Sequence, residues 1–197
     1  MTGAGEALRE SVRGAYSAAA AQPEGRHPFP VGAAFALSVG YPAELLSRLP
    51  EEPVNAFAGV ADVSISAPIE LGQTVVDLGC GAGLDSLIAA GRVGDSGTVI
   101  GFDFSAAMLG RAQLGGLRSG LSNVHFVQAA AESLPLPDSS IDVVLVNGIF
   151  NLNPFRGDIF RELARVLRPG GRVAGAELVL RDALPESLQT GNANWFS

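Results

Sequence analysis

The sequence predicts an α/β fold with a doubly wound, mostly parallel sheet. From residue 74 onward, strand-like and helix-like patterns alternate along the chain. The strand-like segments consist almost entirely of Val, Ile and Leu, which is typical of parallel strands buried on both faces. With 197 residues, 47% of them hydrophobic, the chain can bury one substantial core.

The N-terminal part precedes this alternation and predicts mostly helix and loop. Residues 6–21 are rich in alanine and indicate a helix, which three prolines within residues 22–32 end. Pro42 favours the first turn of a short helix over Ala43–Leu49. Residues 50–73 then predict a long connection of mixed character.

Five strands and three helices fit the alternating part, separated by turns rich in Gly, Pro, Asp and Ser. The predicted strands are Thr74–Leu78, Thr98–Asp103, Val124–Gln128, Ile141–Asn147 and Gly171–Val179. The predicted helices are Leu84–Arg92, Ala106–Ser119 and Asp158–Leu167. In such folds the ligand lies outside the carboxyl ends of the strands, so the turn after the first strand is the expected binding site.

Composition excludes several classes of function. The net charge is −7 without a basic cluster, which argues against binding to nucleic acid. All 13 basic residues are arginine, so neither Schiff-base chemistry nor a P-loop lysine is available. The single cysteine forms neither an internal disulfide nor a structural zinc site, and we expect no metal site. No apolar run of about 18 residues and no signal peptide are present, so we expect a cytoplasmic protein that does not span a membrane.

The stretch "VVDLGCGAG" (residues 75–83) takes the predicted first strand into a glycine-rich turn. The dinucleotide-binding fingerprint needs a third glycine three residues after the second. In the two registers that Gly79, Gly81 and Gly83 allow, that position is Leu84 or Ser86. The pattern therefore argues against a dinucleotide and against a nicotinamide-dependent oxidoreductase.

Two carboxylates indicate which chemical groups the ligand carries. Asp103 ends the second strand 20 residues after Gly83, where a carboxylate accepts hydrogen bonds from ribose hydroxyls. Asp77 precedes the turn, and its charge suits an ammonium group better than a pyrophosphate. A nucleoside with an amino-acid tail fits both.

Four stretches in this order, "VVDLGCGAG", "IGFDFS", "AAAESLPLPDSSIDVVLVN" and "VLRPGGR", resemble the class I S-adenosylmethionine-dependent methyltransferases over about residues 70–180. The resemblance implies a Rossmann-like methyltransferase fold, with S-adenosyl-L-methionine as cofactor. It divides the chain into a helical cap (1–70), a cofactor-binding domain (71–181) and a short tail (182–197). Because the fold normally continues with a helix and an antiparallel hairpin, we expect the hairpin to be absent and the tail truncated. An uncovered edge would favour a homodimer.

The resemblance also assigns roles to individual residues. The methionine moiety would lie against Gly79, Cys80, Gly81 and Gly83, with Asp77 toward its amino group. Asp103 would hold the ribose, Phe104 would lie near the adenine, and Met108 would also contact the cofactor. Ala130 replaces the family's usual acid, which leaves the backbone around Ala131 and Glu132 to bind the adenine. Asn147 would sit beside the transferred methyl group.

A narrower resemblance, through residues 37–86 and "NGIFNLNP", is to the arsenite methyltransferase group. Tyr16 matches a tyrosine that lies near the sulfonium in that group. Members of the group capture trivalent arsenic with cysteine thiolates. Here Ala18, Val60 and Gly148 stand at the cysteine positions, so the resemblance argues against arsenite methylation.

We therefore expect methyl transfer to a small-molecule acceptor by in-line displacement, in which the protein mainly positions the partners. Glu177 is the first candidate for a base, followed by Tyr16 and His27, whereas His125 is expected at the surface. The alternative is a catalytically silent, cofactor-binding relative.

Overall fold

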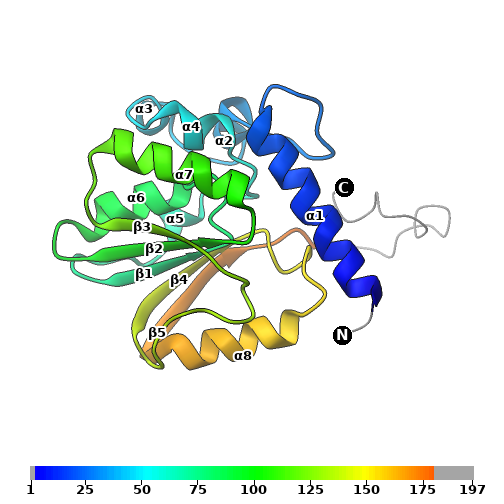
Figure 1. Cartoon of the computed structure of the whole chain (residues 1–197). Helices are drawn as coiled ribbons and strands as arrows, with labels where there is room; N and C mark the ends of the chain where they lie inside the picture. The colour runs from blue at the N-terminus through cyan, green and yellow to red at the C-terminus, as the bar shows by residue number, and fades with distance from the viewer. Residues whose placement is uncertain (1–2, 180–197) are drawn as a thin grey trace.

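The computed structural model describes residues 3–179, which form a parallel five-stranded sheet between two layers of helices (Figure 1). The strands are β1 (Thr74–Leu78), β2 (Thr98–Asp103), β3 (Val124–Gln128), β4 (Ile141–Asn147) and β5 (Leu167–Ala176). The helices are α1 (Gly3–Ala21), α2 (Ala33–Ser38), α3 (Ala43–Leu46), α4 (Glu51–Asn55), α5 (Val63–Ser66), α6 (Leu84–Val93), α7 (Ala106–Ser119) and α8 (Arg156–Val166). The strand order is β3-β2-β1-β4-β5, so the order of the chain reverses between β1 and β4. The predicted doubly wound fold is confirmed.

The first four strands and α7 have the predicted bounds, and the other predicted helices differ by a few residues at their ends. The fifth strand was placed wrongly, because it begins at Leu167 and ends at Ala176. Its register against β4 shifts between Ile141 and Val143, whose partners are Leu167 and Arg172, so the expected turn is part of the strand. The predictions that the C-terminal hairpin is absent and that the tail is truncated concern residues outside the described range of 3–179.

The connection over residues 22–73 contains more helix than its sequence indicated. Of its four short helices, only α3 was predicted. The helices α2, α4 and α5 have six, five and four residues, too few for a helical hydrophobic period to stand out. Among the helices of residues 3–179, none is long and apolar enough to cross a bilayer.

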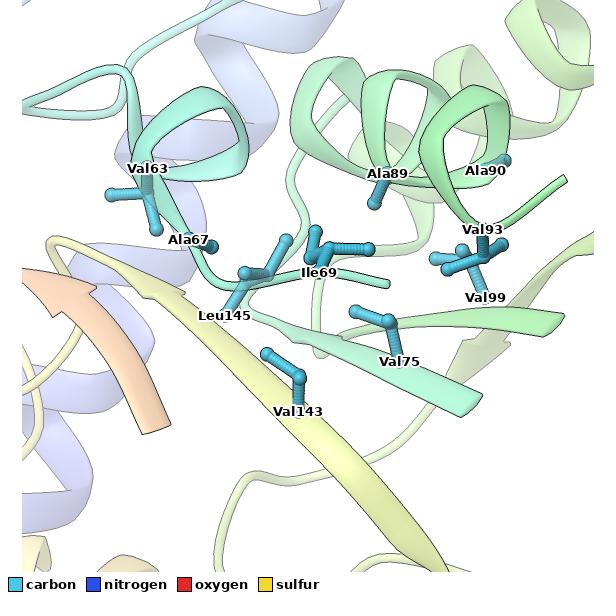
Figure 2. Close-up of a cluster of buried hydrophobic side chains, with 10 residues drawn as sticks. All are labelled: Val63, Ala67, Ile69, Val75, Ala89, Ala90, Val93, Val99, Val143 and Leu145. Carbon is cyan, nitrogen blue, oxygen red and sulfur yellow. The ribbon is translucent and has the colours of Figure 1, made fainter. Parts of the chain in front are cut away.

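The sheet has a hydrophobic core on each face because successive residues of a strand point to opposite sides. Val75 and Val143 meet α6 on one face through Ala89, Ala90 and Val93 (Figure 2). Their neighbours Val76 and Val144 belong to the second core, which α8 covers with Ile159, Leu163 and Val166. Figure 1 shows α6 and α7 on one side of the sheet and α8 on the other.

The cap packs on the same layer of helices through two further clusters. Tyr41 and Phe57 are buried against Leu84 and Ile88 of α6. At the end of α1, the buried Ala19 and Ala20 cluster with Ala82 and Met108. The cap is therefore attached directly to the turn that follows β1 and to α7.

Candidate functional site

A cavity of about 1030 Å³, a volume that includes its open mouth, lies at the carboxyl ends of β1, β2 and β4. This is the crevice where strand order reverses, the usual ligand site of open α/β sheets. Its floor is the turn after β1, and α1 contributes Arg9, Val12 and Tyr16 to its wall. Of the eleven residues that the sequence assigned to the cofactor, ten line the cavity and Gly83 does not, although its neighbours Ala82 and Leu84 do. The ten are Asp77, Gly79, Cys80, Gly81, Asp103, Phe104, Met108, Ala131, Glu132 and Asn147.

The turn after β1 requires glycine for two different reasons. Gly79 has φ 74°, and a Cβ there would lie 2.4 Å from Ile149 Cγ2. Gly83 caps α6 with φ 89°, and a Cβ would lie 2.9 Å from Phe126 Cζ. A side chain at Gly79 would collide with the wall of the cavity, whereas one at Gly83 would collide with the protein interior. Gly83 thus shapes the cradle from behind.

Asp103 ties the ends of β1 and β2 together. Its carboxylate accepts hydrogen bonds from Gly81 N at 2.9 Å and from Ser105 N at 2.8 Å. Burial raises the pKa of Asp103 to about 6, although these backbone N–H groups oppose the shift. Each carboxylate oxygen has two lone pairs, so acceptor capacity remains for a ligand's hydroxyl groups.

Two more aspartates make the base of the cavity acidic. Asp77 is 2% exposed, and its Oδ2 accepts a hydrogen bond of 2.5 Å from Ser86 Oγ. Burial and the charges of Asp85 and Asp103 raise the pKa of Asp77 well above its usual range. A cation beside Asp77 would lower this pKa, because an opposite charge stabilises the carboxylate.

Asp85 connects the cap to this acidic base. Its Oδ1 accepts from Tyr41 Oη at 2.5 Å and from Ser64 N at 3.2 Å, and its Oδ2 accepts from Asn147 Nδ2 at 2.8 Å. Burial and the neighbouring Asp85 raise the pKa of Tyr41, so this hydroxyl remains a donor. The residues span 44, 21 and 62 positions from Asp85, separations at which local sequence patterns carry no signal.

Asn147 lines the cavity, but its amide is already engaged. Oδ1 accepts from Val60 N at 2.7 Å and Ala61 N at 3.2 Å, and Nδ2 also donates to Ala61 O at 2.8 Å. The amide therefore fastens the connection before α5 to the end of β4. Its expected place beside the methyl group stays a prediction, and the contacts describe a positioning residue.

The other predicted catalytic residues differ in their availability. The Tyr16 ring stacks on Phe29 with centroids 4.5 Å apart, and no hydrogen bond within residues 3–179 engages its hydroxyl. Burial, with Asp103 and Glu177 nearby, raises the pKa of Tyr16, which favours the protonated donor. Glu177 does not line the cavity, and its carboxylate accepts from Phe150 N at 2.7 Å and Asn151 N at 3.3 Å. A role for Glu177 as a base stays a prediction.

The remaining candidates lie away from the cavity or cannot act there. His27 Nε2 is 2.8 Å from Gln22 O, and His125 is exposed, as expected. Cys80 is buried, and burial beside Asp77 and Asp103 raises the pKa of its thiol, so it is a poor nucleophile. Within the described part of the chain, no cluster of His, Cys, Asp and Glu could hold a metal ion.

On α1, two lining residues were missed by the sequence analysis. Arg9 and Val12 precede Tyr16 by seven and four positions, a spacing that places all three on one face of α1. That periodicity was visible in the sequence. The contact between Val60 and Gly148 was also unexpected: a Cβ on Gly148 would lie 3.1 Å from Val60 Cγ1. Two of the three positions where arsenite methyltransferases were expected to carry cysteines are therefore neighbours, and neither has a thiol.

Comparisons with known proteins agree with this geometry. Residues 69–196 match the family model described as "Methyltransferase domain". An arsenite methyltransferase of Halobacterium salinarum is 38% identical over 151 residues, which are 77% of this chain and 38% of that protein. A demethylmenaquinone methyltransferase of Lactococcus lactis is 38% identical over 106 residues, 54% of this chain and 42% of that protein.

A solved structure agrees as well. The arsenic(III) S-adenosylmethionine methyltransferase from Chlamydomonas reinhardtii is 36% identical with a TM-score of 0.66, over 73% of this chain and 50% of that chain. The expected resemblance to class I S-adenosylmethionine-dependent methyltransferases, near the arsenite group, is confirmed. The chain spans less than half of the length of the two curated relatives described above.

Proposed function

This chain belongs to the methyltransferase domain family, and we propose that it transfers a methyl group from S-adenosyl-L-methionine to a small-molecule acceptor. S-adenosyl-L-methionine is the cofactor that this membership implies. We propose the small-molecule acceptor, the in-line displacement and the methyltransferase activity of the whole protein on the grounds that follow.

The acidic base of the cavity is the observation that carries the proposal. Asp77, Asp85 and Asp103 all line the cavity and are all buried. These carboxylates come from β1, α6 and β2 and meet at one cavity, where they disfavour a pyrophosphate and favour a ligand that brings positive charge. S-adenosyl-L-methionine has a sulfonium and an ammonium group, so its charges complement the cavity.

The residues present fit the parts of this cofactor. The glycine turn supplies close backbone, with open space at the position of a Cβ on Gly81. Asp77 would hold the amino group and Asp103 the ribose hydroxyls. The apolar wall around Met108 and Ala131 would hold the adenine. When bound, the cofactor supplies a methyl group that its sulfonium already activates.

The protein's own part in the reaction would be to position the acceptor and to exclude water. A displacement in line with the breaking bond gains most from holding the two reacting atoms in place. Tyr16 is supported as a hydrogen-bond donor at the cavity wall, because the pKa of its hydroxyl is raised and the hydroxyl has no partner in residues 3–179. It would orient the acceptor rather than deprotonate it.

The acceptor region is mostly apolar, which supports a small organic molecule. Phe57, Ile149 and Leu152 contribute to the wall near the end of β4. A metalloid held by several thiolates finds no support, because Cys80 is the only cysteine of the chain. The arsenite methyltransferases among its relatives share the scaffold and do not establish the acceptor.

A catalytically silent, cofactor-binding relative is the second candidate. The engagement of Asn147 and Glu177 in structural hydrogen bonds favours it, since neither side chain is free to act on an acceptor. The two candidates differ in one observable, because both predict cofactor binding and only the first predicts turnover.

The test is the formation of S-adenosylhomocysteine, measured with panels of small phenols, thiols, amines and carboxylates. The first candidate predicts turnover with some acceptor, and a Tyr16→Phe variant with about tenfold lower kcat and little change in cofactor affinity. Cofactor binding without turnover on any panel would favour the silent relative.

We also propose that the protein is a homodimer in the cytoplasm. A monomer in size-exclusion chromatography with light scattering would contradict the dimer.

A further inference from the structure

Arg9 is the one basic side chain that lines the cavity among residues 3–179. It points from α1 toward the connection between β3 and β4, where its Nη2 lies 3.6 Å from Glu132 Oε2. The Glu132 side chain is 14% exposed and the Arg9 side chain 35%. Both residues line the cavity, so the pair lies in its wall, partly shielded from water, and joins two segments 123 positions apart in the chain.

One carboxylate oxygen of Glu132 accepts a hydrogen bond and the other does not. Its Oε1 accepts a hydrogen bond of 2.8 Å from Asn153 Nδ2, on the connection between β4 and α8. Its Oε2 is buried without a hydrogen-bond partner, and 3.6 Å to Arg9 is longer than a hydrogen bond. One carboxylate thus contacts two other segments that border the cavity, and the contact to α1 is incomplete.

The other end of α1 is firmly attached. Ser17 Oγ lies 2.9 Å from Ser105 Oγ, and Arg111 Nε donates to Ala20 O. Near the N-terminal end, the contact beside Arg9 is apolar: a Cβ on Gly5 would lie 3.2 Å from Phe155 Cζ. The polar attachment of the N-terminal half to the cavity rim therefore depends on Arg9.

We propose that Arg9 is a positioning residue that, through Glu132, closes α1 over the adenine end of the cofactor cavity. This inference rests on the proposed function. A ligand that fills the cavity removes water from around the ion pair, and the attraction between the two charges is stronger in that environment. The pair contributes little while it is hydrated and more once the cofactor is bound. Its loss should appear in cofactor release more than in the stability of the free protein.

The experiment compares Arg9→Met with Arg13→Met in the full chain. Arg13 lies on the same helix and pairs with Glu10, so its removal also deletes an exposed ion pair without changing the cavity. With S-adenosylhomocysteine as the probe, Arg9→Met should raise Kd about fivefold, equivalent to about 1 kcal/mol, through faster dissociation in stopped flow. Arg13→Met should stay within about twofold of the wild type, and Arg9→Lys should recover part of the loss.

A second measurement separates closure from folding. In the wild type, the probe should slow hydrogen exchange of the α1 amides, and in Arg9→Met this protection should be reduced although the unliganded melting temperatures agree. Equal dissociation rates and equal protection in the wild type and Arg9→Met would overturn the inference and leave the proposed function intact. If the wild type does not bind the probe, the proposed function fails, and this inference fails with it.

Discussion

The cradle after β1 and the cap over it are built by different kinds of information. The cradle, residues 74–103, is set by neighbours in sequence: a buried strand, glycines with positive φ and an aspartate at the end of the next strand. The cap, of which residues 3–70 are described, is held by contacts between distant residues, such as Tyr41 with Asp85 and Val60 with Asn147. The difference teaches that local pattern specifies the cofactor end of the cavity, while long-range hydrogen bonds determine what covers it.

The largest expected effect concerns the cradle. Asp103→Ala removes the acceptor of two backbone N–H groups and of the ribose hydroxyls, so cofactor affinity should fall at least about a hundredfold. Asp95→Ala, in an exposed turn, is the matched control and should bind normally. Calorimetric titration with S-adenosylhomocysteine measures both. Unchanged affinity in Asp103→Ala would mean that the cradle has been assigned to the wrong ligand.

The next effect concerns the junction of the two regions. Asp85→Ala leaves the Tyr41 hydroxyl, Ser64 N and the Asn147 amide without their acceptor in a buried site. The free energy of unfolding should fall by about 3 kcal/mol, measured by denaturant unfolding. A loss below about 1 kcal/mol would show that the cap is attached mainly by its apolar clusters.

A smaller effect comes from pH. Since the pKa of Asp103 is raised to about 6 in the unliganded protein, its carboxyl gains a proton as pH falls below that value and loses acceptor capacity. Cofactor affinity should therefore be nearly constant above pH 7 with respect to Asp103 and fall about fivefold between pH 6 and pH 5. Titrations at several pH values check this, and affinity that rises on acidification would contradict the assignment.

The smallest effect concerns one tether of α1. Ser17→Ala removes the hydroxyl contact to Ser105 and should lower the free energy of unfolding by about 1 kcal/mol or less. Ser38→Ala is a matched control, because that hydroxyl bonds only to Phe35 O within its own helix. Denaturant unfolding of the two variants should show a larger loss for Ser17→Ala, and equal losses would remove Ser17 from the attachment of α1.

The same division explains what the sequence could predict. The bounds of β1 to β4, the glycine turn and Asp103 all follow from local hydrophobic pattern and turn chemistry. The start of β5 did not, because a strand that continues through "RPGG" violates the local preference for a turn and depends on pairing with β4. Arg9 was detectable from its helical spacing with Tyr16, but its partner Glu132 was not, since that contact depends on the packing of α1.

The central claim is that the acidic cradle takes a cationic nucleoside with an amino-acid tail. Calorimetric titration of the full chain with S-adenosyl-L-methionine, with NADH fluorescence as a parallel assay, tests it most directly. The account predicts saturable one-to-one binding of S-adenosyl-L-methionine and no change in NADH fluorescence. Absence of binding together with shifted or quenched NADH fluorescence would contradict it.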